Sequence, residues 1–214
     1  MKKSFNKSFV LLFAFVVWTI AIRIVDVQPI GPNGSSVGFA ALNGRFHDLT
    51  GVHMTLYTIT DWLGLVPIVI CIGFGLLGLT QWIKRKSLRK VDADILILGA
   101  FFLLVIAGYL VFEMVAINYR TVLIEGILEA SYPSSTTLLV LSVMPATVMQ
   151  IGRRVKAPAT AKVLQIICGA FALFMVLGRL ISGVHWLTDI VGGVLLSAGL
   201  VALLRACTEA AENE

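Results

Sequence analysis

The segment GRLISGVHWLTDIVGG, residues 178–193, places Arg179, His185 and Asp189 within eleven residues of an otherwise apolar region. His185 and Asp189 are four residues apart, so they share one helix face if a helix has begun at that point. A carboxylate within reach of an imidazole keeps one ring nitrogen protonated and leaves the other free to attack. The pattern therefore indicates an activated histidine beside an arginine, with a structural histidine–aspartate hydrogen bond as the alternative.

Two other segments carry groups that suit a phosphate. EMVAINYR ends at Arg120, and PSSTT supplies the hydroxyls of Ser134, Ser135 and Thr136. Guanidinium groups match phosphoryl oxygens and keep their charge. A helix capped by Ser134 would also offer free backbone N–H groups to an anion. Taken singly, an outer arginine can instead reach lipid headgroups, and PSSTT can be an ordinary helix start.

The composition indicates that membrane-spanning helices position these groups. Hydrophobic residues make up 58% of the 214 residues and charged residues only 14%, whereas a soluble domain is about one quarter charged. A hydrocarbon core about 30 Å thick needs roughly 20 apolar residues per helix. Six stretches qualify: 8–25, 60–83, 94–117, 135–151, 161–180 and 186–204. We therefore predict an all-α, polytopic membrane protein, a six-transmembrane-helix bundle that forms one membrane-embedded domain over residues 1–214.

The basic residues predict the orientation of this bundle. With the amino terminus inside, thirteen of the seventeen lysines and arginines lie in cytoplasmic segments: Lys2, Lys3, Lys7, Lys84, Arg85, Lys86, Arg89, Lys90, Arg153, Arg154, Lys156, Lys162 and Arg205. This distribution satisfies the positive-inside rule. We therefore expect both termini in the cytoplasm and the phosphate-suited clusters on the extracytoplasmic side of the cell membrane. The formal charge of +5 then requires no nucleic-acid partner.

The remaining segments carry less information. MKKSFNKSFVLLFAFVVWTIAI resembles a signal sequence without a cleavage pattern, so we expect an uncleaved first span. In residues 24–59, QPIGPNGSSVGF predicts turns, and the following AALNGRFHDLTGVHMTLYTITDW predicts an interfacial helix that either caps the outer face or helps substrate reach a site. The three cysteines, Cys71, Cys168 and Cys207, have no metal-ligand spacing, and no disulfide is expected.

At residues 178–193 the sequence resembles the type 2 phosphatidic acid phosphatase family of integral-membrane lipid phosphatases. The third motif of that family reads Ser-Arg, five residues, His, three residues, Asp. This chain has Gly178 in place of the serine, followed by Arg179, His185 and Asp189 at the family spacing. The placement of the motifs after span three, before span four and between spans five and six also fits, and the resemblance covers most of residues 94–204.

The resemblance implies a mechanism without a metal or another cofactor. His185 would attack phosphorus to form a phosphohistidine, and Asp189 would orient the imidazole. Arg120 and Arg179 would hold the developing charge, aided by the region of Ser134 and Ser135. Thr136 and Glu113 are further candidates for substrate binding. Water would then release phosphate. The implied partners are a lipid phosphate substrate and the bilayer, and the sequence does not indicate an oligomeric state.

The first and second motifs depart from the family pattern. The second motif is Pro-Ser-Gly-His, whose histidine protonates the leaving oxygen, whereas PSST places Thr136 there. A threonine hydroxyl cannot act as an acid at neutral pH. The first motif is a lysine, six residues and Arg-Pro; here Glu113 replaces the lysine and Thr121 follows Arg120. Glu113 and Arg120 are seven residues apart, so we expect them on one helix face.

Three consequences of the missing histidine remain open. Another residue supplies the proton, and the candidates are His47, His53, Glu113, Glu125 and Glu129. Alternatively, the substrate is a polyprenyl diphosphate rather than phosphatidic acid, because the departing phosphate monoester has a second pKa of about 6 and needs little acid help. In the third case the protein binds a lipid phosphate without hydrolysis, or transfers the phosphoryl group elsewhere.

The sequence favours a metal-independent phosphatase acting on a lipid phosphate or diphosphate at the outer leaflet. A small transporter or scaffold using the intramembrane charges of Arg23, Asp61 and Glu113 is the alternative. No inverted repeat or pair of broken helices supports that alternative.

Overall fold

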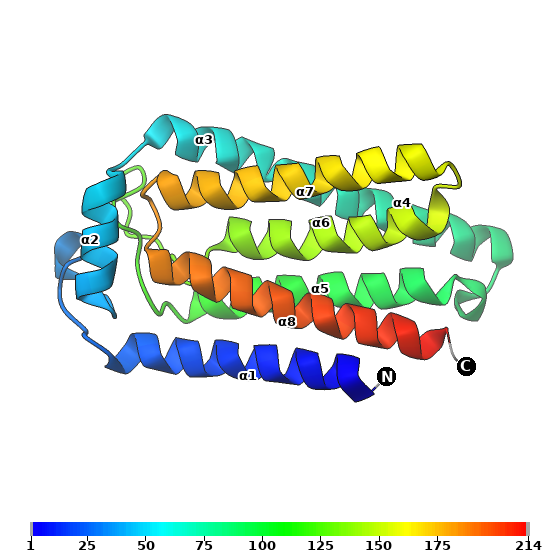
Figure 1. The fold of residues 1–214 in the computed structure, drawn as a ribbon, viewed down its shortest axis with the longest axis horizontal. Helices are drawn as coiled ribbons and strands as arrows, with labels where there is room; N and C mark the ends of the chain where they lie inside the picture. The colour runs from blue at the N-terminus through cyan, green and yellow to red at the C-terminus, as the bar shows by residue number, and fades with distance from the viewer. Residues whose placement is uncertain (1, 213–214) are drawn as a thin grey trace.

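The computed structural model describes residues 2–212, and its long elements are all helices (Figure 1). These are α1 (Lys2–Ile24), α2 (Ala40–Thr50), α3 (Met54–Leu63), α4 (Leu65–Arg85), α5 (Ala93–Met114), α6 (Ser135–Arg154), α7 (Pro158–Ile181) and α8 (Leu187–Ala211). Two short 3-10 turns, Pro32–Gly34 and Leu88–Lys90, lie in the connections.

The predicted six-span helical bundle is confirmed. Six segments in the described part of the chain are long and apolar enough to cross a membrane: Ser4–Ile24, Met54–Arg85, Ala93–Met114, Ser135–Arg154, Pro158–Ile181 and Leu187–Ala211. The second differs from the prediction of 60–83, because it begins earlier and consists of α3 and α4, which meet at Gly64. The third ends at Met114 rather than at 117, and the sixth continues well beyond 204 to Ala211.

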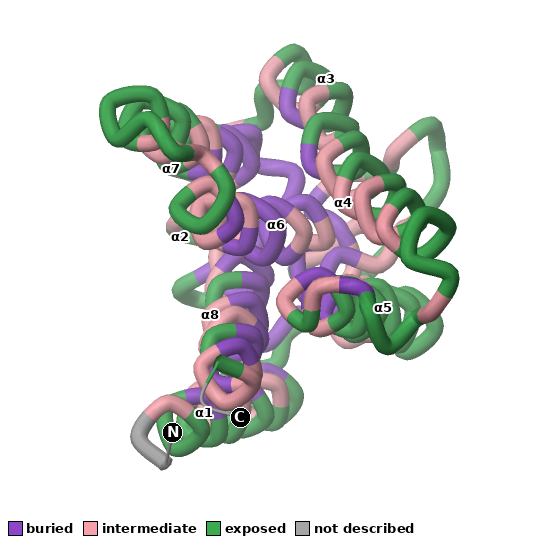
Figure 2. The backbone as a smooth tube through the Cα atoms, turned by 90° about the vertical axis from the view of Figure 1, so that its right-hand side faces the viewer, coloured by how far each residue is buried: buried purple, intermediate pink, exposed green. Residues whose placement is uncertain are grey.

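Helix α6 lies at the centre of the bundle, with α4, α5, α7 and α8 around it (Figure 2). Its buried positions include small and polar residues such as Thr137, Ser142 and Ala146, which let neighbouring helices approach. Helix α1 packs along α8, where the Ser8 hydroxyl donates a hydrogen bond to the carbonyl of Gly199 at 2.9 Å. The faces turned away from α6 carry exposed apolar side chains, as a lipid-facing surface requires.

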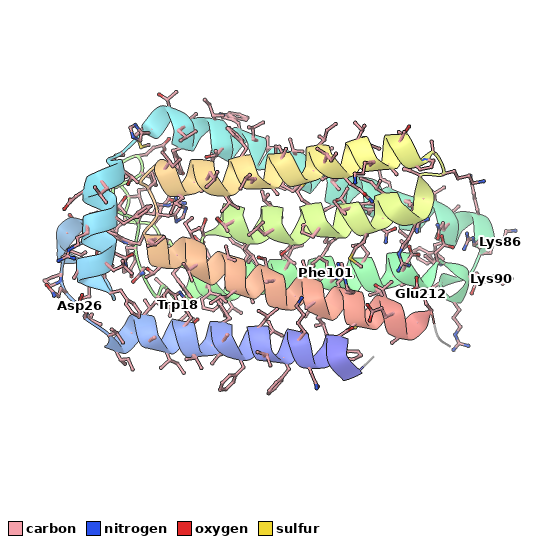
Figure 3. All side chains as sticks on the ribbon, viewed as in Figure 1. Trp18, Asp26, Lys86, Lys90, Phe101 and Glu212 are labelled. Atoms are coloured by element: carbon pink, nitrogen blue, oxygen red, sulfur yellow. The ribbon has the colours of Figure 1, made fainter. Side chains whose placement is uncertain are left out.

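Polar side chains gather at the two ends of the bundle (Figure 3). The basic end, which carries Lys86 and Lys90, is also where α1 begins and α8 ends (Figure 1). Helix α2 crosses the opposite end, where α5 and α7 finish and α6 and α8 start. The expected interfacial helix is therefore shorter than 40–62: it stops at Thr50, because Gly51 adopts a φ of +65° that ends the helical path.

Candidate active site

Residues 118–121 run alongside residues 183–189, which form the loop before α8 and the first turn of that helix. Hydrogen bonds join the two segments. The Asn118 amide nitrogen donates to Asp189 Oδ1 at 2.9 Å, and the Trp186 indole donates to the Tyr119 carbonyl at 2.8 Å. Next along both segments, Arg120 Nη1 lies 3.4 Å from His185 Nε2. The register of this pairing brings the first-motif arginine to the third-motif histidine, although 65 residues separate them in sequence.

Thr121, which replaces the proline of the family motif, extends the same pairing. Its hydroxyl donates to the carbonyl of Gly183, and its backbone N–H donates to the Val184 carbonyl at 3.4 Å. A proline has no N–H and no hydroxyl, so neither bond would form. Gly183 itself has a φ of +69°, and a Cβ there would lie 1.8 Å from the carbonyl oxygen of Gly51. The loop carrying His185 is thus held between residue 121 and the α2–α3 connection.

His185 lies in this loop, because α8 begins only at Leu187. The condition for a shared helix face is therefore not met, because the helix has not begun at His185, yet the His185 and Asp189 side chains still approach each other. His185 Nδ1 is 3.8 Å from Asp189 Oδ2, a separation that is too long for a hydrogen bond. A guanidinium can only donate, so His185 Nε2 must accept from Arg120. The ring proton consequently resides on Nδ1, toward Asp189, and Nε2 keeps its lone pair.

Burial lowers the pKa of His185 to about 4, with Asp189 opposing that shift and the nearby guanidinium groups adding to it. The imidazole is therefore neutral at pH 7. A neutral imidazole whose Nε2 carries no proton is the nucleophilic form of this side chain.

Asp189 is fully buried and its carboxylate is held from two sides. Oδ1 accepts from Asn118, and Oδ2 accepts from the backbone N–H of Trp186 at 3.0 Å. The second bond caps the start of α8, which explains why the helix begins after His185. These two hydrogen bonds therefore fix the carboxylate in position beside the imidazole.

Arg120 lies at the base of a short hairpin formed by residues 119–130. Bridges join Tyr119 to Ala130 and Ile124 to Ile127, and the tight turn passes through Glu125 and Gly126 with positive φ angles. Within this hairpin, Arg120 Nε forms an ion pair with Glu129 Oε2 at 2.8 Å. The carboxylate therefore fixes the guanidinium in place.

Arg179 lies deeper than Arg120 and is only 1% exposed. Its Nη2 donates to Asp61 Oδ1 at 2.8 Å and to the Thr136 hydroxyl at 2.6 Å. The Tyr57 ring lies 4.6 Å from the Arg179 guanidinium and 5.5 Å from that of Arg120, within cation–π range. Arg179 is therefore anchored behind the cavity wall, close to Arg120 but already engaged.

The packing of α7 against α3 explains why position 178 is a glycine rather than the serine of the family motif. A Cβ on Gly178 would lie 2.6 Å from Thr60 Cγ2 of α3. The serine of the family motif would therefore push α3 away from α7, and with it Asp61, the partner of Arg179. The loss of this serine accompanies the close approach of the two helices.

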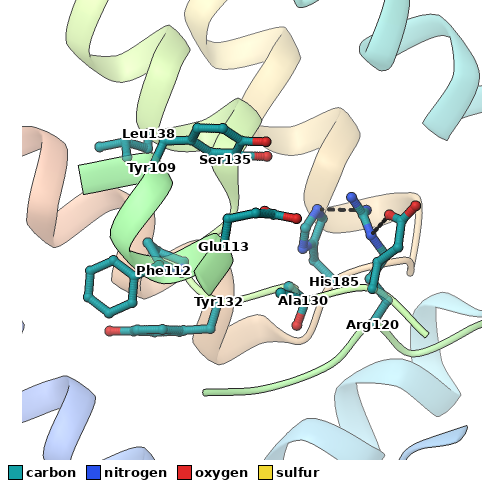
Figure 4. Close-up of a pocket in the computed structure, with 12 residues that line it drawn as sticks. Tyr109, Phe112, Glu113, Arg120, Ala130, Tyr132, Ser135, Leu138 and His185 are labelled. Carbon is teal, nitrogen blue, oxygen red and sulfur yellow. Dashed lines mark hydrogen bonds and ion pairs between the residues drawn. The ribbon is translucent and has the colours of Figure 1, made fainter. Parts of the chain in front are cut away.

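A cavity of about 260 Å³ lies in front of His185 (Figure 4). Arg120, Glu113, Glu129, Tyr109 and Ser135 also line it. Glu113 is on α5, whereas Arg120 follows the end of that helix. The expectation of a shared helix face is therefore wrong, and the two residues meet across the cavity instead.

Several other sequence candidates are not among the residues that line this cavity. Ser134 is fully buried and caps α6 as predicted, its hydroxyl accepting from the Thr137 N–H at 3.4 Å. His47 packs against the Trp186 ring at 5.6 Å, and His53 Nε2 contacts the Thr50 carbonyl. Glu125 is at the tip of the hairpin. Among the acid candidates, only Glu113 and Glu129 line the cavity.

A second cavity of about 530 Å³ adjoins the first. It shares Tyr109, Ser135 and Leu138 with the first cavity. Asp61 and Thr136 form its polar end, and its remaining wall is apolar: Leu65, Ile68, Val105, Ile106, Leu110 and Leu139. An apolar groove open toward the lipid-facing surface thus leads to the polar cavity.

These features define a membrane protein with an anion-suited, histidine-containing site at one end of a six-span bundle. Residues 69–212 match the sequence model of the PAP2 superfamily, and the chain belongs to that superfamily. The fold is similar to the crystal structure of a transmembrane PAP2-type phosphatidylglycerolphosphate phosphatase from Bacillus subtilis, with a TM-score of 0.57 and 20% identity over 95% of this chain and 96% of that chain. No curated protein sequence matches the chain.

Proposed function

We propose that this protein is a metal-independent lipid phosphatase that forms a phosphohistidine at His185. Membership of the PAP2 superfamily supports lipid phosphate chemistry in general. The observation that carries the proposal is the unprotonated Nε2 of a neutral, buried imidazole, which accepts a hydrogen bond from Arg120 beside the polar cavity that His185 lines. This arrangement presents a nucleophile and a cation to the same phosphate.

The proposed reaction has two steps. His185 Nε2 attacks phosphorus, the bond from phosphorus to the leaving oxygen breaks, and its electron pair goes to that oxygen. Asp189 stabilises the positive charge that develops on the imidazole, and Arg120 neutralises charge on the phosphoryl oxygens. A water oxygen then attacks phosphorus, the P–N bond breaks, and its electron pair returns to Nε2. Inorganic phosphate leaves and the histidine is regenerated.

The apolar groove supports a lipid as the substrate. It joins the polar cavity at Tyr109, Ser135 and Leu138, so a phosphate in front of His185 can carry a hydrocarbon chain that lies in the groove. The basic residues at the opposite end of the bundle favour an outer-leaflet location for the site through the positive-inside rule. We therefore propose a polyprenyl diphosphate or a phospholipid phosphate of the outer leaflet as substrate.

Phosphate release from a panel of lipid phosphates, in detergent and with or without a chelator, tests this function. We expect release that the chelator does not reduce, together with an acid-labile phosphoenzyme in a rapid quench. The threonine at position 136, in place of the second-motif histidine, is the reason for one competing outcome, an impaired protein that binds lipid phosphate without releasing phosphate. Substrate accumulation in vesicles without phosphate release would contradict the proposal in favour of a transporter.

Filling the apolar groove should lower activity on lipid substrates but not on soluble ones. Leu110→Trp places a large ring in the groove but not in the polar cavity. We expect kcat/KM for a long-chain lipid phosphate to fall about tenfold, equivalent to about 1.4 kcal/mol, while an aryl phosphate is hydrolysed normally. Leu110→Ala, which leaves the groove open, is the matched control. An equal loss with both substrates would instead indicate a general structural effect.

The acid side of the pH profile should reflect the pKa of His185. Because burial lowers this pKa to about 4, the ring stays neutral at pH values where an ordinary histidine has gained a proton. We expect kcat/KM, corrected for ionisation of the substrate, to hold down to about pH 5 and to fall as the ring protonates below that. A decline centred near the ordinary histidine pKa, about 6.5, would show that His185 is not held in this environment.

A further inference from the structure

The proposed reaction lacks the proton donor that the PAP2 second motif would provide. Thr136 occupies that position, and its hydroxyl accepts a hydrogen bond from Arg179. An alkoxide that leaves a phosphate monoester needs a proton as the P–O bond breaks, and a positioned acid contributes about 10²–10⁴-fold to such steps. The inference below rests on the proposed phosphatase function and concerns the source of this proton.

Three of the four carboxylates around the site already have partners. Asp189 accepts hydrogen bonds from Asn118 and the Trp186 backbone. Glu129 and Asp61 form ion pairs with the two arginines, at 2.8 Å in each case. Within residues 2–212, the Glu113 side chain has neither a hydrogen bond nor an ion pair, and it lines the polar cavity. Glu113 is thus the carboxyl group that remains free for a substrate.

The position of Glu113 also meets the geometric requirement for an acid. Displacement at phosphorus places the leaving oxygen roughly in line with the nucleophile, on the opposite side of phosphorus. Figure 4 shows the Glu113 carboxyl group directed from α5 toward His185, so the two side chains face each other across the cavity. A phosphate between them would direct its leaving oxygen at Glu113. Tyr109 also lines this wall, but a phenol is a much weaker acid than a carboxylic acid.

We propose that Glu113 is the general acid that protonates the leaving oxygen, in place of the missing histidine. In the first step, the Glu113 proton passes to this oxygen as the P–O bond breaks, so the lipid leaves as an alcohol. In the second step, the Glu113 carboxylate takes a proton from the attacking water, whose oxygen bonds to phosphorus. The Glu113 carboxyl group thereby regains the proton that it lost in the first step, and it is ready for another cycle.

This role identifies the substrate class that the site accepts. With an acid opposite His185, the cavity can expel an alkoxide, so simple lipid phosphate monoesters become substrates alongside diphosphates. A lysine at position 113, as in the family motif, would bind the phosphate more strongly but would not serve as this acid.

The dependence of rate on the leaving group tests this assignment. Glu113→Gln keeps the size and polarity of the side chain but has no acidic proton. We expect kcat/KM for a long-chain lipid phosphate monoester to fall about 10²–10⁴-fold, whereas 4-nitrophenyl phosphate and a prenyl diphosphate, whose leaving groups need little protonation, change less than about threefold. Across a series of aryl phosphates, the rate of the variant should depend more steeply on the acidity of the departing phenol.

Glu129→Gln is the matched control, because Glu129 lines the same cavity but positions Arg120. We expect it to slow every substrate by a similar factor, with an unchanged leaving-group dependence. An equal effect of Glu113→Gln on all substrates, or no effect, would overturn the assignment while wild-type phosphate release continued. An absence of wild-type hydrolysis for every substrate would instead overturn the proposed function itself. Thermal unfolding in detergent checks that each variant remains folded.

Discussion

His185→Ala is expected to lower phosphate release by at least about a thousand-fold, because the variant has no nucleophile and only binding and electrostatic effects remain. The phosphoenzyme should disappear at the same time, since Nε2 is the atom that carries the phosphoryl group in the proposed reaction. Rapid acid-free quenching with radiolabelled lipid phosphate measures both quantities in one experiment.

His53→Ala provides the matched control for this substitution. His53 lies on the same end of the bundle, but its side chain is exposed and contacts the Thr50 carbonyl at the end of α2. We expect normal phosphate release and a normal phosphoenzyme level from this variant. A phosphoenzyme that persists in His185→Ala would mean that another residue is the nucleophile. His185→Gln, which preserves more of the side-chain volume, guards against loss of activity through a packing defect.

Asp189→Asn should have the second largest effect. The carboxylate accepts bonds from Asn118 and from the Trp186 N–H, and it faces the proton on His185 Nδ1. An amide has one acceptor oxygen, so at least one of these donors would face an NH₂ group. We expect kcat to fall about 10²–10⁴-fold because the imidazole loses its preferred tautomer and its counter-charge. The free energy of unfolding should fall by about 1–3 kcal/mol.

Steady-state kinetics and thermal unfolding in the same detergent measure these two effects of Asp189→Asn. The control is Asp48→Asn, the same chemical change at an exposed position of α2. It should leave both quantities unchanged. Retention of full kcat by Asp189→Asn would show that the carboxylate serves only to cap α8, as its bond to Trp186 allows.

The fold and the outline of the site are predictable because they depend on local patterns. Long apolar runs separated by polar segments define the six spans. The spacing from Arg179 to His185 and Asp189 carries the third motif, and a serine before an apolar run predicts the Ser134 cap. Each of these signals lies within a short stretch of sequence, so residue types and spacing are enough to reveal it.

The partners inside the site are not predictable in this way, because they come from elements that are far apart in sequence. Asp61 is recognisable only as an intramembrane charge, and its pairing with Arg179 depends on how α3 packs against α7. Tyr57 and Asn118 carry no local signal for their roles. The early end of α5 also depends on residues that are distant in sequence, because residues 118–121 pair with the loop before α8 instead of continuing the helix. This long-range pairing is what separates Glu113 from Arg120.

The ion pair between Arg120 and Glu129 also bears on how the cavity empties after each reaction. A phosphate that binds the other donors of this guanidinium lies beside the Glu129 carboxylate, which competes with it for Arg120. Inorganic phosphate has no hydrocarbon chain to compensate for this competition, so we expect it to be held less tightly than the lipid that delivers it. Product inhibition should accordingly be weak, and a resident carboxylate would help to clear the site between turnovers.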